Sequence, residues 1–119
     1  MNYEVICEKM LNADQAIRFV GVYTYNGEMI FNKMRPNTES MLTEDQIKMS
    51  MYYAKLRHET REHLEHKIGK EEFSMSKYEK LIRFTIPFER DLILISADAN
   101  ANYTKIIGDI LSVIKDNKN

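Results

Sequence analysis

The sequence has few of the residues that build covalent or catalytic machinery. Its 119 residues include one cysteine, Cys7, so an intrachain disulfide is impossible and a reducing, intracellular compartment is favoured. The four glycines are scattered and cannot form a phosphate-binding loop, and neither a nucleophile elbow nor a dinucleotide-binding motif is present. These absences predict that the protein is not an enzyme and uses no cofactor.

A strong charge of one sign and long apolar runs are also missing. The 17 basic and 18 acidic residues give a net charge of −1, which provides no long-range attraction for nucleic acid or an anionic membrane. The longest uncharged apolar stretch, near Leu92 to Ala97, is too short to cross a bilayer, and the N-terminus lacks the features of a signal peptide. We therefore expect a cytoplasmic protein without nucleic-acid or membrane partners.

The apolar pattern of the first third predicts a helix followed by a hairpin. The helix covers about residues 2–14, and the hairpin strands cover Ile17–Tyr25 and Glu28–Lys33. Asn26-Gly27 between the strands is typical of a type I′ turn, because both residues tolerate positive φ. Alternation along the first strand places Ile17, Phe19, Gly21, Tyr23 and Tyr25 on one face, and Arg18, Val20, Val22 and Thr24 on the other.

The middle of the chain carries a strong helix start signal. Thr43 and Gln46 have the spacing of a capping box, and Glu44 and Asp45 place negative charge at the positive end of the helix dipole. We expect this second helix to run to Ile68 and to end at Gly69. Its first half carries an apolar surface wider than one stripe, and its second half is polar.

The last third predicts three strands and a closing helix, so residues 1–119 are expected to form one domain. The strands cover Phe73–Glu79, Leu81–Phe88 and Leu92–Ala97, and the helix begins after Asn100 or Asn102. One helix face gathers Tyr103, Ile106, Ile107, Ile110, Leu111 and Ile114. The order α-β-β-α-β-β-β-α indicates an α+β fold, with sandwich-like α/β layers around a five-stranded antiparallel sheet.

Two segments resemble a known family. Residues 20–30, VGVYTYNGEMI, combine a Gly-Val strand, a turn glycine and a second strand, and residues 92–100, LILISADAN, join a last strand to a C-terminal helix. In these segments, and in topology over nearly the whole chain, the sequence resembles the Roadblock (dynein light-chain) family of the profilin-like group. The resemblance implies a Roadblock/profilin-like fold and a non-enzymatic protein.

The same resemblance implies how the protein acts. Roadblock-like domains pair through their second helix and third strand, and serve as scaffolds or regulators, often with small GTPases. A homodimer is thus expected, with a protein partner such as a small GTPase. The implied interface consists of Met49, Tyr52, Tyr53 and Leu56 on the helix and Met75, Lys77 and Tyr78 on the strand. The breadth of the helix's apolar surface independently favours a covering partner. The alternative is that these residues belong to the intramolecular core.

Two further hypotheses concern ligands. Glu59, His63 and His66 stand at i, i+4 and i+7, the spacing of one helix face, and are candidate metal ligands if a fourth comes from elsewhere. We favour the interpretation that they form a solvated face of mixed charge, with no metal bound. The second hypothesis is a PAS- or profilin-like small-molecule sensor, with a pocket between sheet and helix lined by Tyr23, Phe84 and methionines.

Overall fold

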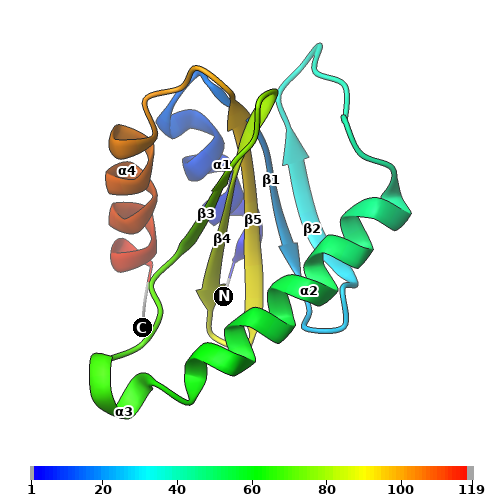
Figure 1. The fold of residues 1–119 in the computed structure, drawn as a ribbon. Coiled ribbons are helices and arrows are strands. Elements are labelled where there is room, and N and C mark those ends of the chain that lie inside the picture. The colour runs from blue at the N-terminus through cyan, green and yellow to red at the C-terminus, as the bar shows by residue number, and fades with distance from the viewer. Residues whose placement is uncertain (1, 118–119) are drawn as a thin grey trace.

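The computed structural model describes residues 2–117 as an antiparallel sheet between two layers of helices (Figure 1). The elements are α1 (Tyr3–Ala13), β1 (Ile17–Tyr23), β2 (Met29–Met34), α2 (Glu44–Glu62), α3 (Glu65–Ile68), β3 (Ser74–Lys77), β4 (Leu81–Phe88), β5 (Asp91–Asp98) and α4 (Tyr103–Asp116). The five strands lie in the order β2-β1-β5-β4-β3, and every neighbouring pair is antiparallel. The expected α+β fold and five-stranded sheet are confirmed. No helix among residues 2–117 is long and apolar enough to cross a membrane.

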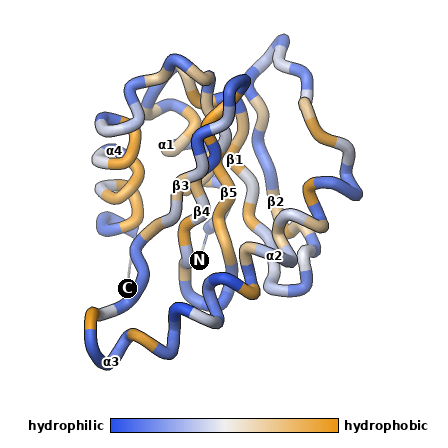
Figure 2. The backbone as a smooth tube through the Cα atoms, viewed as in Figure 1, coloured by the Kyte–Doolittle hydropathy of each residue, from blue (hydrophilic) through white to orange (hydrophobic). Residues whose placement is uncertain are grey.

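The two faces of the sheet are covered unequally. Helices α1 and α4 pack on one face and enclose the larger core, whereas α2 alone crosses the other face (Figures 1 and 2). In α4, Ile106, Ile110 and Ile114 are buried at intervals of four residues, which is one helix face. Cys7 of α1 has no exposed surface, and its burial raises the pKa of the thiol to about 11.

An irregularity in β1 changes which face of the sheet its first residue occupies. Pairing with β5 shifts register between Ile17 and Phe19, so one extra residue stands on β1 at this point. Ile17 is buried in the same core cluster as Val20 and Val22. Simple alternation had placed Ile17 with Phe19, and this expectation is wrong because a bulge reverses the side-chain phase.

The β1–β2 turn also differs from its expected type. The amide of Gly27 donates to the Thr24 carbonyl at 3.0 Å, and the amide of Thr24 donates to the Glu28 carbonyl at 2.8 Å. Gly27 has φ of 84°, but Asn26 does not have positive φ. A type I′ turn needs positive φ at both central residues, so the prediction of that type is wrong. The contacts match a three-residue loop that closes with a left-handed glycine.

The second helix begins as expected and ends earlier. Gln46 N–H donates to Thr43 Oγ1 at 3.1 Å, and Thr43 N–H donates to Gln46 Oε1 at 2.9 Å, which confirms the capping box. The expected continuous helix to Ile68 is wrong, because α2 ends at Glu62 and the short α3 follows. Gly69 terminates α3 with φ of 87°.

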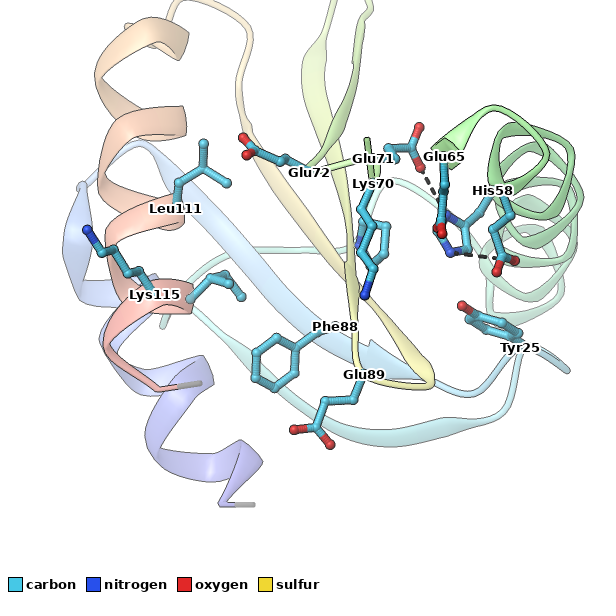
Figure 3. A pocket seen from close by; sticks show the side chains of 13 residues that line it. Tyr25, His58, Glu65, Lys70, Glu71, Glu72, Phe88, Glu89, Leu111 and Lys115 are labelled. Atoms are coloured by element: carbon cyan, nitrogen blue, oxygen red, sulfur yellow. Dashed lines mark hydrogen bonds and ion pairs between the residues drawn. The ribbon is translucent and has the colours of Figure 1, made fainter. Parts of the chain in front are cut away.

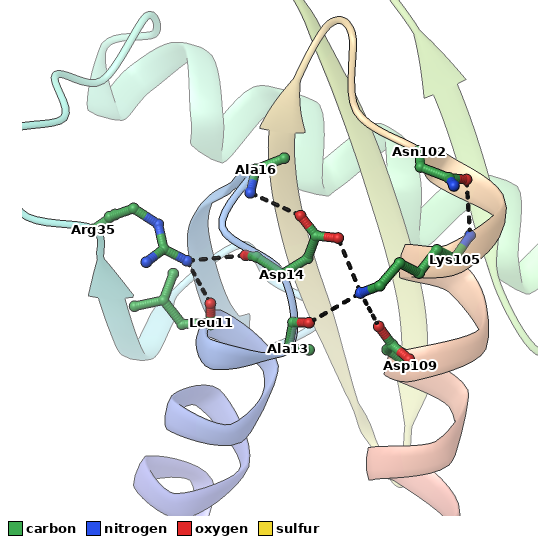
Figure 4. A network of polar contacts seen from close by, with 8 residues as sticks. All are labelled: Leu11, Ala13, Asp14, Ala16, Arg35, Asn102, Lys105 and Asp109. Atoms are coloured by element: carbon green, nitrogen blue, oxygen red, sulfur yellow. Dashed lines mark hydrogen bonds and ion pairs between the residues drawn. The ribbon is translucent and has the colours of Figure 1, made fainter.

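Polar contacts hold α1 against β1, β2 and α4 (Figure 4). The Arg35 guanidinium after β2 donates to the carbonyls of Leu11, Asp14 and Ile17. On the other side, Lys105 Nζ lies 3.1 Å from Asp14 Oδ2. A hydrogen bond from the Ala16 amide and the ammonium of Lys105 together lower the pKa of Asp14. The end of α1 is thus fixed from both sides.

Candidate interaction surface

The inward face of α2 is a narrow stripe. Met51, Ala54 and His58 are buried, and Ile47 packs against them at the same helical phase. They lie over a small cluster of sheet side chains, formed by Tyr23, Leu92 and Leu94. This stripe uses only one side of the helix, so the remaining apolar residues of α2 do not face their own sheet.

The opposite side of α2 exposes four large apolar side chains, which we call the outer face. The exposed fractions are 61% for Met49, 48% for Tyr52, 53% for Tyr53 and 38% for Leu56. The rings of Tyr52 and Tyr53 meet edge to face, with centroids 5.7 Å apart. Within one chain these four residues are therefore not core, and α2 carries apolar surface on two sides.

The sheet ends at β3 on the side toward which α2 runs. Strand β3 pairs with β4 on one side only, so within the described chain its other edge is open. Of the three residues expected on the strand, Met75 packs against the larger core and Lys77 is exposed, whereas Tyr78 is exposed just after β3, which ends earlier than expected. Alternation puts Lys77 on the same sheet face as Met75, away from α2. Beside α2, the sheet therefore presents the open backbone edge of β3 and the exposed side chain of Tyr78, which is 52% exposed.

A polar cluster ties the C-terminal end of α2 to the start of β3. Glu71 Oε2 accepts hydrogen bonds from Arg61 Nη1 and from Ser74 Oγ, the latter at 3.1 Å. Glu71 Oε1 lies 3.1 Å from Nδ1 of His58. The His58 ring in turn packs edge to face against the Tyr25 ring, with the ring centroids 5.9 Å apart. Burial alone would raise the pKa of Glu71, but the bonds from Arg61, His58 and Ser74 outweigh it and lower this pKa. The cluster therefore holds a stable carboxylate.

The alternative of a metal site at Glu59, His63 and His66 depended on one continuous helix. Glu59 belongs to α2, His63 follows its last residue, and His66 lies in α3. The premise of one continuous helix face is therefore wrong. Among residues 2–117, no group of three His, Cys, Asp or Glu side chains is placed to hold a metal ion. The buried histidine is instead His58, which was not among the candidate ligands.

The alternative of a small-molecule sensor required a pocket lined by Tyr23 and Phe84 together. Tyr23 belongs to the cluster under α2, whereas Phe84 belongs to the larger core on the other face of the sheet. Both side chains are buried, so the sheet itself separates them. Phe84 lines a small hollow against α4, and Tyr23 does not line it. The sensor hypothesis loses the pocket on which it rested.

A cleft that the sequence did not reveal lies between α2–α3 and α4 (Figure 3). It has a volume of about 830 Å³. Its lining comes from five separate parts of the chain: the β1–β2 turn, the end of α2 with α3, the segment before β3, the β4–β5 turn and the end of α4. Such a site has no local sequence signal, because tertiary structure alone brings these segments together.

The sequence matches a known protein family over almost its whole length. A model described as "Family of unknown function (DUF6659)" matches residues 1–118. The chain belongs to this family. No curated protein matches the sequence.

Solved structures identify the fold of this DUF6659 protein. An MglB with tetrameric arrangement is similar at TM-score 0.73 and 12% identity, over 95% of this chain and 82% of that one. A Roadblock/LC7 domain from Streptomyces avermitilis is similar at TM-score 0.70 and 8% identity, over 98% and 94%. LokiProfilin1, solved in complex with rabbit actin, is similar at TM-score 0.52 and 11% identity, over 98% and 95%. The fold is Roadblock-like within the profilin-like group.

Proposed function

We propose that this DUF6659 protein is a homodimeric interaction module, a scaffold or regulator without catalytic chemistry, and that residues 1–119 form one Roadblock-like domain. The observation that carries the proposal is the outer face of α2. Four large apolar side chains are exposed there, and the end of the same helix is bonded through Arg61 to Ser74 of β3, whose outer edge is open. Exposed apolar patches and open edges are liabilities for a monomer, and burial in a partner removes both.

A second copy of the chain is the simplest partner for this surface. In a two-fold interface each chain contributes the same patch, so α2 meets α2 and β3 meets β3. Antiparallel pairing of the two β3 strands would continue the sheet across the dimer and satisfy the edge backbone groups. The tetrameric arrangement of one similar structure, an MglB, supports the view that this fold permits self-association.

Charge placed on the outer face tests the proposal. Leu56→Glu introduces a carboxylate into the patch, and we expect it to raise the dimer dissociation constant by at least about tenfold in analytical ultracentrifugation. Ser112→Glu is the matched control, because Ser112 is exposed on α4, which packs on the other face of the sheet from α2. If both variants associate as the wild type does, the outer face is not the interface.

The partner of the dimer is proposed from the Roadblock resemblance. We infer that the module works in the cytoplasm and binds a small GTPase. The test is a binding titration with small GTPases of the same organism, each in its GDP-bound and GTP-bound forms. A nucleotide-dependent affinity is the expected result, and no binding of either form would contradict this part of the proposal.

A further inference from the structure

We propose that the cleft between α2–α3 and α4 binds a basic peptide segment of a partner protein, with an apolar side chain between its lysine or arginine residues. The cleft lies on the sheet-facing side of α2, where the buried side chain of His58 forms part of its wall. The outer face of α2 points the other way. The inference is therefore independent of the proposed dimer.

The rim of the cleft is acidic. Five glutamates line it, against two lysines, in a chain whose 17 basic and 18 acidic residues almost balance. The glutamates are Glu62, Glu65, Glu71, Glu72 and Glu89, and the lysines are Lys70 and Lys115. This local excess of negative charge selects a cationic occupant and disfavours nucleic acid.

Three of these carboxylates are not used by the fold. Glu71 is bound by Arg61, Ser74 and His58, and Glu62 Oε1 lies 3.8 Å from Nε2 of His58. Within residues 2–117, Glu65, Glu72 and Glu89 have no ion-pair partner. They come from α3, the segment before β3 and the β4–β5 turn, so they surround the cleft from three directions (Figure 3).

The floor of the cleft is apolar. Pro87 and Phe88 at the end of β4 line it together with Leu111 and Ile114 of α4. The ring of Tyr25 lies beside His58 (Figure 3). An apolar floor inside an acidic rim matches a peptide better than a bare cation. The alkyl stems of lysine and arginine pack on apolar surface while their charged ends reach carboxylates. Apolar contact also argues against a metal ion, which prefers converging oxygen ligands.

A designed peptide tests the inference. The probe is fluorescein-labelled Gly-Lys-Lys-Leu-Lys-Gly, and its binding is followed by fluorescence anisotropy at about 50 and about 300 mM NaCl. The triple variant Glu65→Gln, Glu72→Gln, Glu89→Gln removes the three unused carboxylates. The control Glu28→Gln, Glu39→Gln, Glu79→Gln makes the same change in net charge at exposed positions outside the cleft.

We expect the cleft variant to bind the peptide at least about tenfold more weakly than the wild type, and the control variant within about twofold of it. Leu111→Ala, which leaves the charge unchanged, weakens binding about threefold or more, since it removes part of the floor. Equal weakening by both triple variants, or no binding of the peptide at about 1 mM, would overturn the proposal. Spermine binding as tightly as the peptide would overturn the role of the apolar floor. Unchanged circular dichroism in each variant ensures that these losses report binding.

Discussion

His58 Nδ1 lies 3.1 Å from Glu71 Oε1, and this contact joins two segments on opposite sides of the α2–α3 turn. The second oxygen of Glu71 accepts from Arg61, on the last turn of α2. One carboxylate therefore receives two side chains from α2 and the hydroxyl of Ser74 from β3. The position of α2 relative to the sheet edge depends on this residue.

Glu71→Gln should destabilise the protein, since it removes the charge from a cluster in which the Glu71 side chain is 15% exposed. We expect the free energy of unfolding at neutral pH to fall by about 1–3 kcal/mol, measured by urea denaturation. Glu72→Gln, its exposed neighbour, should change the free energy by less than about 0.5 kcal/mol. Equal effects of the two substitutions would show that the cluster contributes nothing specific.

The contribution of Glu71 should also depend on pH. Its pKa in the folded protein lies below the ordinary value of 4.5, so the folded state binds this proton more weakly than the unfolded state. The stabilisation is therefore complete above that value and is lost as pH falls through the lowered folded pKa. Urea denaturation at several pH values measures this. The difference in unfolding free energy between wild type and Glu71→Gln should shrink once the pH is below the ordinary glutamate pKa of 4.5. A difference that stays constant into acid would contradict the assigned direction.

Two glycine-to-alanine substitutions should have opposite signs. A Cβ at Gly21 would lie 2.8 Å from Phe19 Cζ and 2.8 Å from Tyr23 Cε1, because both rings fold over the glycine. Gly21→Ala should lower the unfolding free energy by about 1–3 kcal/mol. At Gly108, in α4, a Cβ would meet nothing within 4 Å. Gly108→Ala should raise the unfolding free energy by about 0.5–1 kcal/mol. Thermal unfolding distinguishes the two, and a stabilising Gly21→Ala would contradict the packing described.

The Cys7 thiol should be inert in the folded protein. It is fully buried and its pKa is raised to about 11, so very little reactive thiolate exists at neutral pH. Reaction with a thiol reagent such as Ellman's reagent should follow the unfolded fraction as urea is added. Rapid labelling of the native protein would contradict the burial of α1 against the sheet.

Much of the fold could be predicted from local patterns. The capping box at Thr43, the strand Leu81–Phe88 and the start of α4 after Asn102 are all where the sequence indicated. The exposure of Tyr53 and Leu56 agrees with an apolar helix surface wider than one stripe. These features depend on short-range periodicity and capping, which the sequence displays directly.

The remaining features depend on contacts distant in sequence. Nothing local interrupts helix propensity at His63 and Leu64, where the Leu64 amide bonds instead to the Arg61 carbonyl at 2.9 Å. The chain turns there toward the contact of Arg61 with Glu71, ten residues on. The inward side of Met75 likewise follows from register with β4, which four strand residues cannot specify alone.

The most direct test of the central claim is the mass of the wild-type protein by light scattering after size-exclusion chromatography, over a wide range of concentration. We expect a stable dimer with twice the chain mass of 14.1 kDa. A protein that remains at the mass of one chain at the highest concentration would contradict the dimer, and the outer face of α2 would then need another partner.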